Sequence, residues 1–115
     1  MAIGTAKQST VDRCMDLCLG CVRECLKCAN HCIRSNDAKK LAECTRLCLD
    51  CVDICGACVG LMGRDSRFSV QTCRVCADLC DACAAECQKY EKDEIIAQCA
   101  EACRRCAESC KQMAA

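Results

Sequence analysis

The sequence predicts an all-α fold, an antiparallel up-down-up-down four-helix bundle with a cysteine-lined core. The chain of 115 residues carries twenty cysteines in four runs, and steps of three and four residues strictly alternate within each run. This spacing is typical of one seam of a helix that packs against neighbours. The chain has no proline and only five glycines, which favours long uninterrupted helices. Short polar segments separate the runs, and connections of this length join antiparallel neighbours.

Each run of cysteines defines one predicted helix. The thiols occupy the seam positions at which a bundle normally carries Leu, Ile and Val. The four runs are Cys14, Cys18, Cys21, Cys25, Cys28 and Cys32; Cys44, Cys48, Cys51, Cys55 and Cys58; Cys73, Cys76, Cys80, Cys83 and Cys87; and Cys99, Cys103, Cys106 and Cys110.

The first two helices are predicted over residues 9–35 and 38–62. Ser9 is the predicted N-cap of the first, with Asp12 at the reciprocal capping position. The segment Ser35-Asn36-Asp37 has the composition of a turn and is expected to cap the second helix.

The third and fourth helices are predicted over residues 70–90 and 94–113. Ser69 is expected to cap the third, and the turn Glu91-Lys92-Asp93 to lead into the fourth. A chain of this length holds one core and not two, so we predict a single domain over residues 1–115.

The composition excludes several classes of partner. Sixteen basic and sixteen acidic residues give zero net charge, and one Tyr and one Phe are the only aromatic residues, so neither nucleic acid nor an anionic membrane is an expected partner. The segment Met1–Gln8 lacks the apolar region of a signal peptide, and no apolar stretch is long enough to span a bilayer. We therefore predict a cytoplasmic protein, in which thiols stay reduced.

Two interpretations of the thiols involve no metal. Buried cysteines can act as small hydrophobes, but twenty of them on a seam give up apolar volume that Leu would provide. The even number of cysteines is also compatible with a disulfide scaffold. However, Cβ atoms three or four residues apart on a helix are about 5–6 Å apart, and a disulfide needs about 3.5–4.5 Å. Bridges within a helix are therefore strained.

Two further interpretations involve metal ions. Zinc and iron–sulfur clusters take four thiolates around one centre, usually from loops; a rigid seam offers its ligands in a line, although four facing helices could form layers of four cysteines. Cu(I) is selected by soft sulfur ligands and accepts two or three of them, so a Cys-x-x-x-Cys pair can close around one ion. One Cu⁺ per thiolate leaves the core neutral, whereas two thiolates per ion leave about ten negative charges inside. The thiols thus favour multiple Cu(I) ions per chain, with an iron–sulfur protein for electron transfer or a zinc-thiolate protein as the alternative.

The chain resembles a known family. Cys-x-x-x-Cys and Cys-x-x-Cys steps that fill four helices, from Cys14 to Cys110, are similar to those of the cytosolic branch of the bacterial copper storage proteins. The resemblance implies storage or sequestration of Cu(I) by core thiolates, a homotetramer of bundles, and no catalysis. A copper chaperone that delivers or removes the ions is a further expected partner. No Ser/His/Asp arrangement, phosphate loop or carboxylate pair indicates an enzyme.

The two ends of the bundle differ in chemistry. Extending the seams to the end where the first helix starts gives Val11, Met62, Val70 and Met113, with Met15 close by; the other end has Leu41, Tyr90 and Ile96, with His31 beside Cys32. Our hypothesis is that Met62 and Met113 form the copper entrance, because thioethers can pass Cu(I) inward without holding it tightly. Alternatively, these methionines only fill the bundle end. His31 is either an exposed polar residue or a relay ligand for metal at the opposite end.

The first helix carries a second apolar stripe beside its cysteines. Leu19, Leu26 and Ile33 belong to this stripe, which is wider than a four-helix bundle needs. They either form an oligomer contact, which is our interpretation, or complete the core of the monomer.

Overall fold

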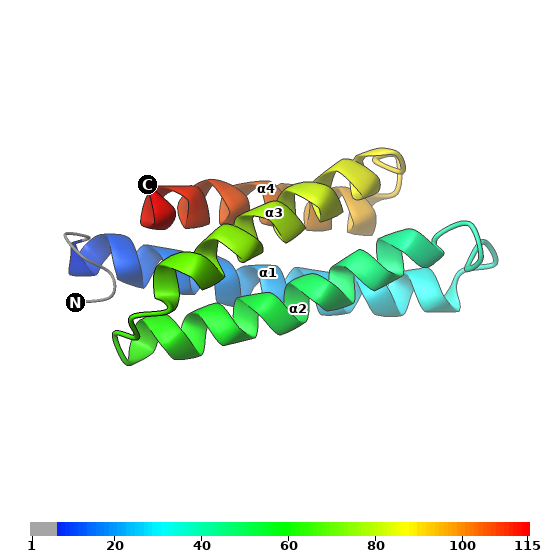
Figure 1. Cartoon of the computed structure of the whole chain (residues 1–115). Helices are drawn as coiled ribbons and strands as arrows, with labels where there is room; N and C mark the ends of the chain where they lie inside the picture. The colour runs from blue at the N-terminus through cyan, green and yellow to red at the C-terminus, as the bar shows by residue number, and fades with distance from the viewer. Residues whose placement is uncertain (1–6) are drawn as a thin grey trace.

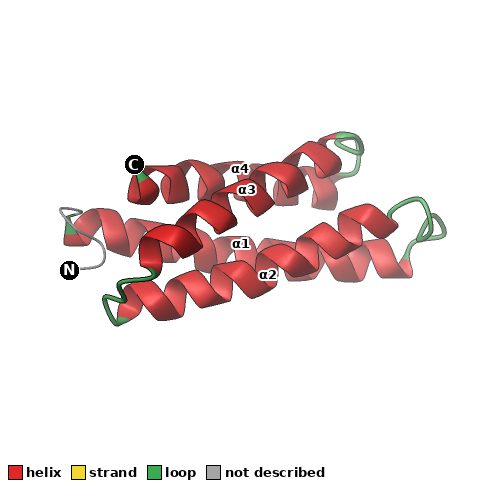
Figure 2. Ribbon diagram, in the orientation of Figure 1, coloured by secondary structure: helices red, strands yellow, loops and turns green. Residues whose placement is uncertain are grey.

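A computed structural model of the chain describes residues 7–115, which fold into four α-helices. The predicted all-α class is confirmed, because the described residues contain no β-strand (Figure 2). The segment Met1–Ala6, on which part of the signal-peptide prediction depends, lies outside the described residues. The helices are α1 (Gln8–Arg34), α2 (Ala42–Gly63), α3 (Ser69–Gln88) and α4 (Glu94–Ala114).

The helices form a long, narrow antiparallel bundle. Each helix contacts its two neighbours, so that α1 packs on α2 and α4, and α3 packs on α2 and α4. Figure 1 shows the start of α1, the end of α4 and the α2–α3 connection at one end, with the other two connections at the opposite end. The bundle measures 48 × 19 × 17 Å between Cα atoms, which leaves room for one column of side chains along its axis. None of the described helices has the length and apolar character needed to cross a membrane.

The cysteines form the core because the alternating steps keep them on the inner face of each helix. Small side chains support this packing on α3 and α4. Ala77, Ala84, Ala100 and Ala107 each follow a cysteine by one residue and are buried, so these two helices can approach each other closely. The apolar side chains that pack beside the thiols on α3 and α4 are therefore small.

Two predicted helix caps are wrong. Ser9 lies inside α1, whose N-cap is Lys7 without a side-chain cap, and Asp12 instead accepts a hydrogen bond from Gln8 at 2.9 Å. Ser69 is the first residue of α3 rather than its cap, and its hydroxyl group makes no capping bond. In both cases the helix already includes the serine that could have capped it, as the second residue of α1 and the first residue of α3.

The third predicted cap is also wrong: α2 begins at Ala42 with Leu41 as its N-cap, four residues later than the predicted start at residue 38, so Ser35-Asn36-Asp37 does not cap it. The Ser35 hydroxyl accepts a hydrogen bond from the backbone N–H of Asp37 at 3.0 Å, and backbone bonds from Ala38 to Ser35 and from Leu41 to Asp37 continue as turns. Side-chain bonds of this kind compete with helix formation. The turns carry Leu41 over the end of the bundle, where it is buried.

Asp93 ties α4 to the end of α1. Its carboxylate caps α4 by accepting hydrogen bonds from the backbone N–H groups of Ile95 and Ile96. The other carboxylate oxygen lies 2.6 Å from Nε2 of His31 on α1. Partial burial acts to raise the pKa of Asp93, but the bonds from His31, Ile96 and Ile95 outweigh it and hold the pKa below its usual value.

Replacing Asp93 tests this junction. We expect Asp93→Ala to lower the free energy of unfolding by about 1 kcal/mol, the usual cost of losing an N-cap. Asp93→Asn keeps a good capping side chain and loses only the charge, so it should cost less. Because the native pKa is depressed, the contribution of the charge is present at neutral pH and disappears as the pH falls through that pKa.

Denaturant unfolding of the metal-free protein at neutral and acidic pH measures these differences. Equal stabilities of the Ala variant and the unmodified chain at neutral pH would contradict the assignment of Asp93 as the cap.

Candidate metal centre

All twenty cysteines lie in the interior of the bundle. Each has 0 % exposed surface, and each is a free thiol. The shortest contact between their sulfur atoms is 3.4 Å, between Cys44 and Cys87. This separation is far longer than the roughly 2.05 Å of a disulfide bond. The structure thus brings together every cysteine that the sequence analysis assigned to the core, without disulfides.

Cys-x-x-x-Cys pairs place two sulfur atoms side by side within one helix. Contacts of this kind measure 3.8 Å between Cys21 and Cys25, 3.8 Å between Cys76 and Cys80, and 3.9 Å between Cys83 and Cys87. Residues four apart are neighbours on a helix surface, and the inward direction of the seam turns both thiols toward the bundle axis. Each such pair can supply two ligands to one ion.

Contacts between helices group the thiols into sets of four. In each set the sulfur atoms all lie within 4.8 Å of one another, and most sets take one cysteine from each helix. Contacting pairs within one set are 3.7–4.0 Å apart, which matches the edge of about 3.8 Å expected when four sulfurs surround an ion at about 2.3 Å. The sets include Cys18, Cys76, Cys106 and Cys110; Cys21, Cys55, Cys80 and Cys106; Cys25, Cys51, Cys83 and Cys103; Cys25, Cys48, Cys83 and Cys99; and Cys28, Cys48, Cys87 and Cys99.

These sets overlap within two groups, and Cys21 joins the groups into one column by its contacts of 3.8 Å with Cys25 and with Cys103. Cys25 and Cys83 belong to two sets, as do Cys48, Cys99 and Cys106. The layers of four cysteines that a zinc site would need are therefore present, but they are not separate sites. A sulfur atom that belongs to two sets can bridge two ions, which is the arrangement that a multi-ion cluster requires.

The column has no buried cation to balance thiolate charge. Among residues 7–115, the buried polar or charged side chains are those of Ser69 and Ser109 alone. A buried thiolate without a partner is strongly unfavourable. The thiols must therefore either keep their protons or exchange them for metal ions.

Neighbouring thiols shift one another's proton affinities. Hydrogen bonds from Cys103 and Cys25 lower the pKa of Cys99 to about 6. Burial raises the pKa of Cys32 at the end of the column, and the charges of Cys28 and Cys44 act in the same direction. Because the thiolate is the metal ligand, a metal ion that binds in the column replaces the proton of a thiol that it contacts.

The end of the column near the chain termini carries two thioethers. Met62 and Met113 are buried there together with Val11. Met15 is half-buried on the same side, and its terminal methyl group lies close to Gly63. The predicted seam residue Val70 is only half-buried, and the fully buried residue of α3 at this end is Ser69. The prediction of Val70 on the seam was wrong because a step of three from Val70 to Cys73 repeats the step of three from Cys73 to Cys76, whereas the steps along each seam alternate.

The other end of the column is covered by apolar side chains. Leu41 and Ile96 are buried, and Tyr90 is half-buried with its hydroxyl group 3.4 Å from the backbone carbonyl of Lys40. His31 lines a surface hollow with Asp93, and its Nε2 is engaged by that carboxylate at 2.6 Å. A metal ion would have to displace Asp93 to use this nitrogen. The sequence analysis missed this pair, since no local pattern connects residues 62 positions apart.

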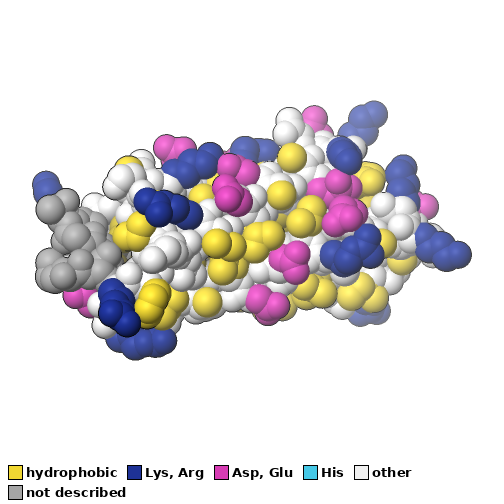
Figure 3. All heavy atoms as spheres, viewed as in Figure 1, with side chains coloured by type: hydrophobic (Ala, Val, Ile, Leu, Met, Phe, Trp, Pro, Cys, Tyr) yellow, Lys and Arg dark blue, Asp and Glu magenta, His cyan; other side chains and the backbone are white. Residues whose placement is uncertain are grey.

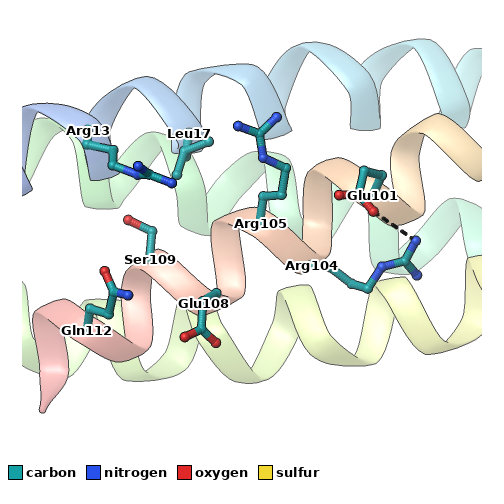
Figure 4. A pocket seen from close by; sticks show the side chains of 8 residues that line it. All are labelled: Arg13, Leu17, Glu101, Arg104, Arg105, Glu108, Ser109 and Gln112. Atoms are coloured by element: carbon teal, nitrogen blue, oxygen red, sulfur yellow. Dashed lines mark hydrogen bonds and ion pairs between the residues drawn. The ribbon is translucent and has the colours of Figure 1, made fainter.

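The surface formed by residues 7–115 differs in chemistry from the interior. Basic and acidic side chains alternate over the face drawn in Figure 3, with apolar side chains between them. A hollow of about 240 Å³ between α1 and α4 is lined by charged residues that include Arg13, Glu101 and Arg104 (Figure 4). Glu101 and Arg104 form an ion pair at 3.1 Å, and no cysteine lines this hollow. The interior column is therefore the candidate site.

The fold and the site together define a class of protein: a helical bundle whose core is a preformed thiol column for soft metal ions. A family model described as copper storage protein matches residues 7–115. The chain therefore belongs to the copper storage protein family, which confirms the resemblance seen in its sequence. A search of curated protein sequences finds no match.

Solved structures agree with this assignment. The Cu(I)-bound copper storage protein BsCsp3 is 38% identical, with a TM-score of 0.87 over 92% of this chain and 99% of that chain. A copper storage protein from Streptomyces lividans loaded with 10 copper equivalents is 30% identical, with a TM-score of 0.92 over 97% and 89% of the two chains. A structure of copper loading to a cytosolic copper storage protein from S. lividans, with five coppers, is 31% identical, with a TM-score of 0.89 over 92% of each chain.

Proposed function

We propose that this chain stores Cu(I) in the cytosol, with up to about one ion for each core cysteine. The observation that carries the proposal is the continuous column of twenty buried, free thiols. The proposed ligands are these cysteines, from Cys14 to Cys110. Similar proteins have been solved with bound Cu(I), with five coppers and with 10 copper equivalents, which supports a cargo of many ions.

The neutral interior supports a high ratio of copper to cysteine. Each Cu⁺ that replaces a thiol proton leaves the net charge of the core unchanged. Fewer ions with fully deprotonated thiols would leave negative charge where the described residues place no buried cation. Partial loading therefore leaves the remaining thiols protonated, and the column can fill in steps.

Storage needs no turnover, and we infer that the protein holds its ions rather than transforming a substrate. The chain is folded before the metal arrives, because its helices are supported by packing around the thiols. A copper chaperone is the proposed partner for delivery or removal, since a column enclosed by helices exchanges its ions by ligand transfer.

We also propose a homo-oligomer, with a homotetramer as the expected form. Leu19, Leu26 and Ile33 on α1 are 53%, 49% and 60% exposed, so they do not complete the core of the monomer. They recur every seven residues along one face of the helix, which is the spacing of a helix–helix contact. Leu49 on α2 is also exposed, but it lies outside this stripe on α1.

For the copper entrance we propose the end with Met62 and Met113. Thioethers are soft, neutral ligands that bind Cu(I) more weakly than thiolates do. Both side chains are buried at the end of the column, one step beyond the last cysteines of α2 and α4. The opposite end is covered by Leu41 and Ile96, which offer no ligand atoms.

Anaerobic titration of the reduced protein with Cu(I) against a competing chelator tests the storage proposal. We expect uptake of many ions, approaching about twenty per chain, since neutrality requires one Cu⁺ per thiolate. The loaded protein should also unfold at a higher temperature, because copper binds the native state. A plateau at one or two ions would contradict storage, and displacement of bound Cu(I) by Zn²⁺ would favour the zinc alternative.

The oligomer contact is tested by Leu26→Lys with Ile33→Lys. A buried Lys in place of an apolar contact residue should dissociate the oligomer, and light scattering coupled to size exclusion should show a smaller mass. Leu49→Lys is the matched control on α2. If the double variant keeps the mass of the unmodified protein, the α1 stripe is not the contact.

The entrance is tested by replacing Met62 and Met113 with Leu. Leu conserves the volume of Met, so the fold and the final capacity should be retained. The rate of anaerobic Cu(I) uptake should fall about tenfold, because a modest rise in the activation barrier for copper entry has an effect of this size. Leu41→Met at the opposite end is the control. If the variant with Leu at positions 62 and 113 takes up copper at the unmodified rate, the entrance lies elsewhere.

A further inference from the structure

Ser69 continues the cysteine seam of α3. It lies four residues before Cys73, and the next step along the seam, to Cys76, is three residues, so the alternation of the run extends to Ser69. The side chain is 1% exposed. A hydroxyl group therefore occupies a position on which the rest of the helix carries thiols.

The Ser69 hydroxyl has no hydrogen-bond partner among the described residues. Its Oγ is the single buried side-chain nitrogen or oxygen atom without a partner among residues 7–115. Leaving a buried hydroxyl group unpaired destabilises the fold. By contrast, the nearby Ser66 hydroxyl accepts a bond from the backbone N–H of Phe68 at 3.1 Å. The unpaired group at Ser69 thus points to a ligand that arrives from outside the chain.

The surroundings of Ser69 are those of the proposed entrance. The outermost cysteines of the four helices at this end are Cys14, Cys58, Cys73 and Cys110. The sulfur atoms of Cys14 and Cys110 are 3.8 Å apart. One step further out, the four seams end in Val11, Met62, Ser69 and Met113, all buried. These residues are three or four positions beyond their cysteines, which is a distance of about 4.5–6 Å along the axis. They form the outermost ring of the column.

We propose that Ser69, Met62 and Met113 form a transit site for Cu(I), with two thioether sulfurs and one hydroxyl oxygen as its donors. This inference rests on the proposed storage function and adds a donor to its entrance. Cu(I) prefers sulfur to oxygen, so the hydroxyl group is a weak ligand. Its weakness suits transit, because the ion is released to the thiols one layer further in.

Transfer from this site is a ligand exchange without redox chemistry. The bonds from copper to the two thioethers and to the hydroxyl oxygen break as bonds to Cys73 and a neighbouring thiol form. The metal remains Cu(I) throughout. One of the two cysteines becomes a thiolate and releases its proton to water at the mouth of the bundle, so the charge of the core is unchanged. The other cysteine binds as a neutral thiol, and Ser69 keeps its own proton.

Three variants test the proposal. Ser69→Ala removes the donor and the unpaired hydroxyl group together. Ser69→Cys replaces the weak donor with a strong one. Ser66→Ala is the matched control, because it removes a hydroxyl group from the same connection outside the column. Each variant is loaded anaerobically with Cu(I) supplied as its acetonitrile complex, and the copper is then withdrawn by a chromogenic Cu(I) chelator.

We expect Ser69→Ala to unfold at a higher temperature without metal and to take up and release copper about tenfold more slowly. Ser69→Cys should take up copper readily and release it more slowly than the unmodified chain, while Ser66→Ala should match the unmodified rates. If Ser69→Ala gains stability and exchanges copper at the unmodified rate, Ser69 is only a packing residue and the proposal is overturned. The equilibrium capacity reports on storage separately, since it should stay the same in Ser69→Ala whichever rate is found.

Discussion

The structure depends on the convergence of uncharged thiols in an interior without any buried cation. Sulfur atoms from four helices approach to 3.4–4.0 Å, yet the only other buried polar side chains in the described residues are two serines. Such a core tolerates protons or metal ions on its sulfurs and little else. A monovalent soft ion exchanges for a proton without changing the charge, so the same interior can be empty, partly filled or full.

This arrangement has a structural cost that the rest of the bundle offsets. A thiol fills less apolar volume than Leu, so the column itself contributes less to stability than an ordinary core. Close helix contacts at residues such as Ala77 and Ala100, and the cap that Asp93 provides for α4, hold the bundle together from outside the column. The exposed stripe of Leu19, Leu26 and Ile33 would add burial in the oligomer proposed above. Interactions outside the column thus stabilise the bundle, and the interior thiols remain available to bind metal.

Much of the fold and of the site could be predicted, because both depend on one periodic pattern. Alternating steps of three and four place every cysteine from Cys14 to Cys110 on an inner face, whatever the details of the connections. The ends of the helices could not be predicted as well, since side-chain bonds such as that of Ser35 compete locally with helix formation. The pair of His31 and Asp93 joins residues from different helices, and only the packing of α1 against α4 brings them together. The sequence analysis predicts Ser69 as a cap because serine is a preferred N-cap residue, although the alternating steps that place the cysteines on one seam also include position 69.

The overlap of the four-sulfur sets bears on the choice between copper and zinc. The separations between sulfur atoms fit tetrahedral zinc as well as Cu(I), so distance alone does not distinguish them. A divalent ion held by four unshared thiolates leaves a charge of about −2 in the core for each site. Sharing of Cys25, Cys48, Cys83 and Cys99 between sets lets each sulfur serve two ions. Ions that accept two or three ligands can then occupy adjacent positions along the column, with one positive charge for each sulfur. The column is therefore better suited to a chain of bridged Cu(I) ions than to isolated tetrahedral sites, in agreement with the family to which the chain belongs.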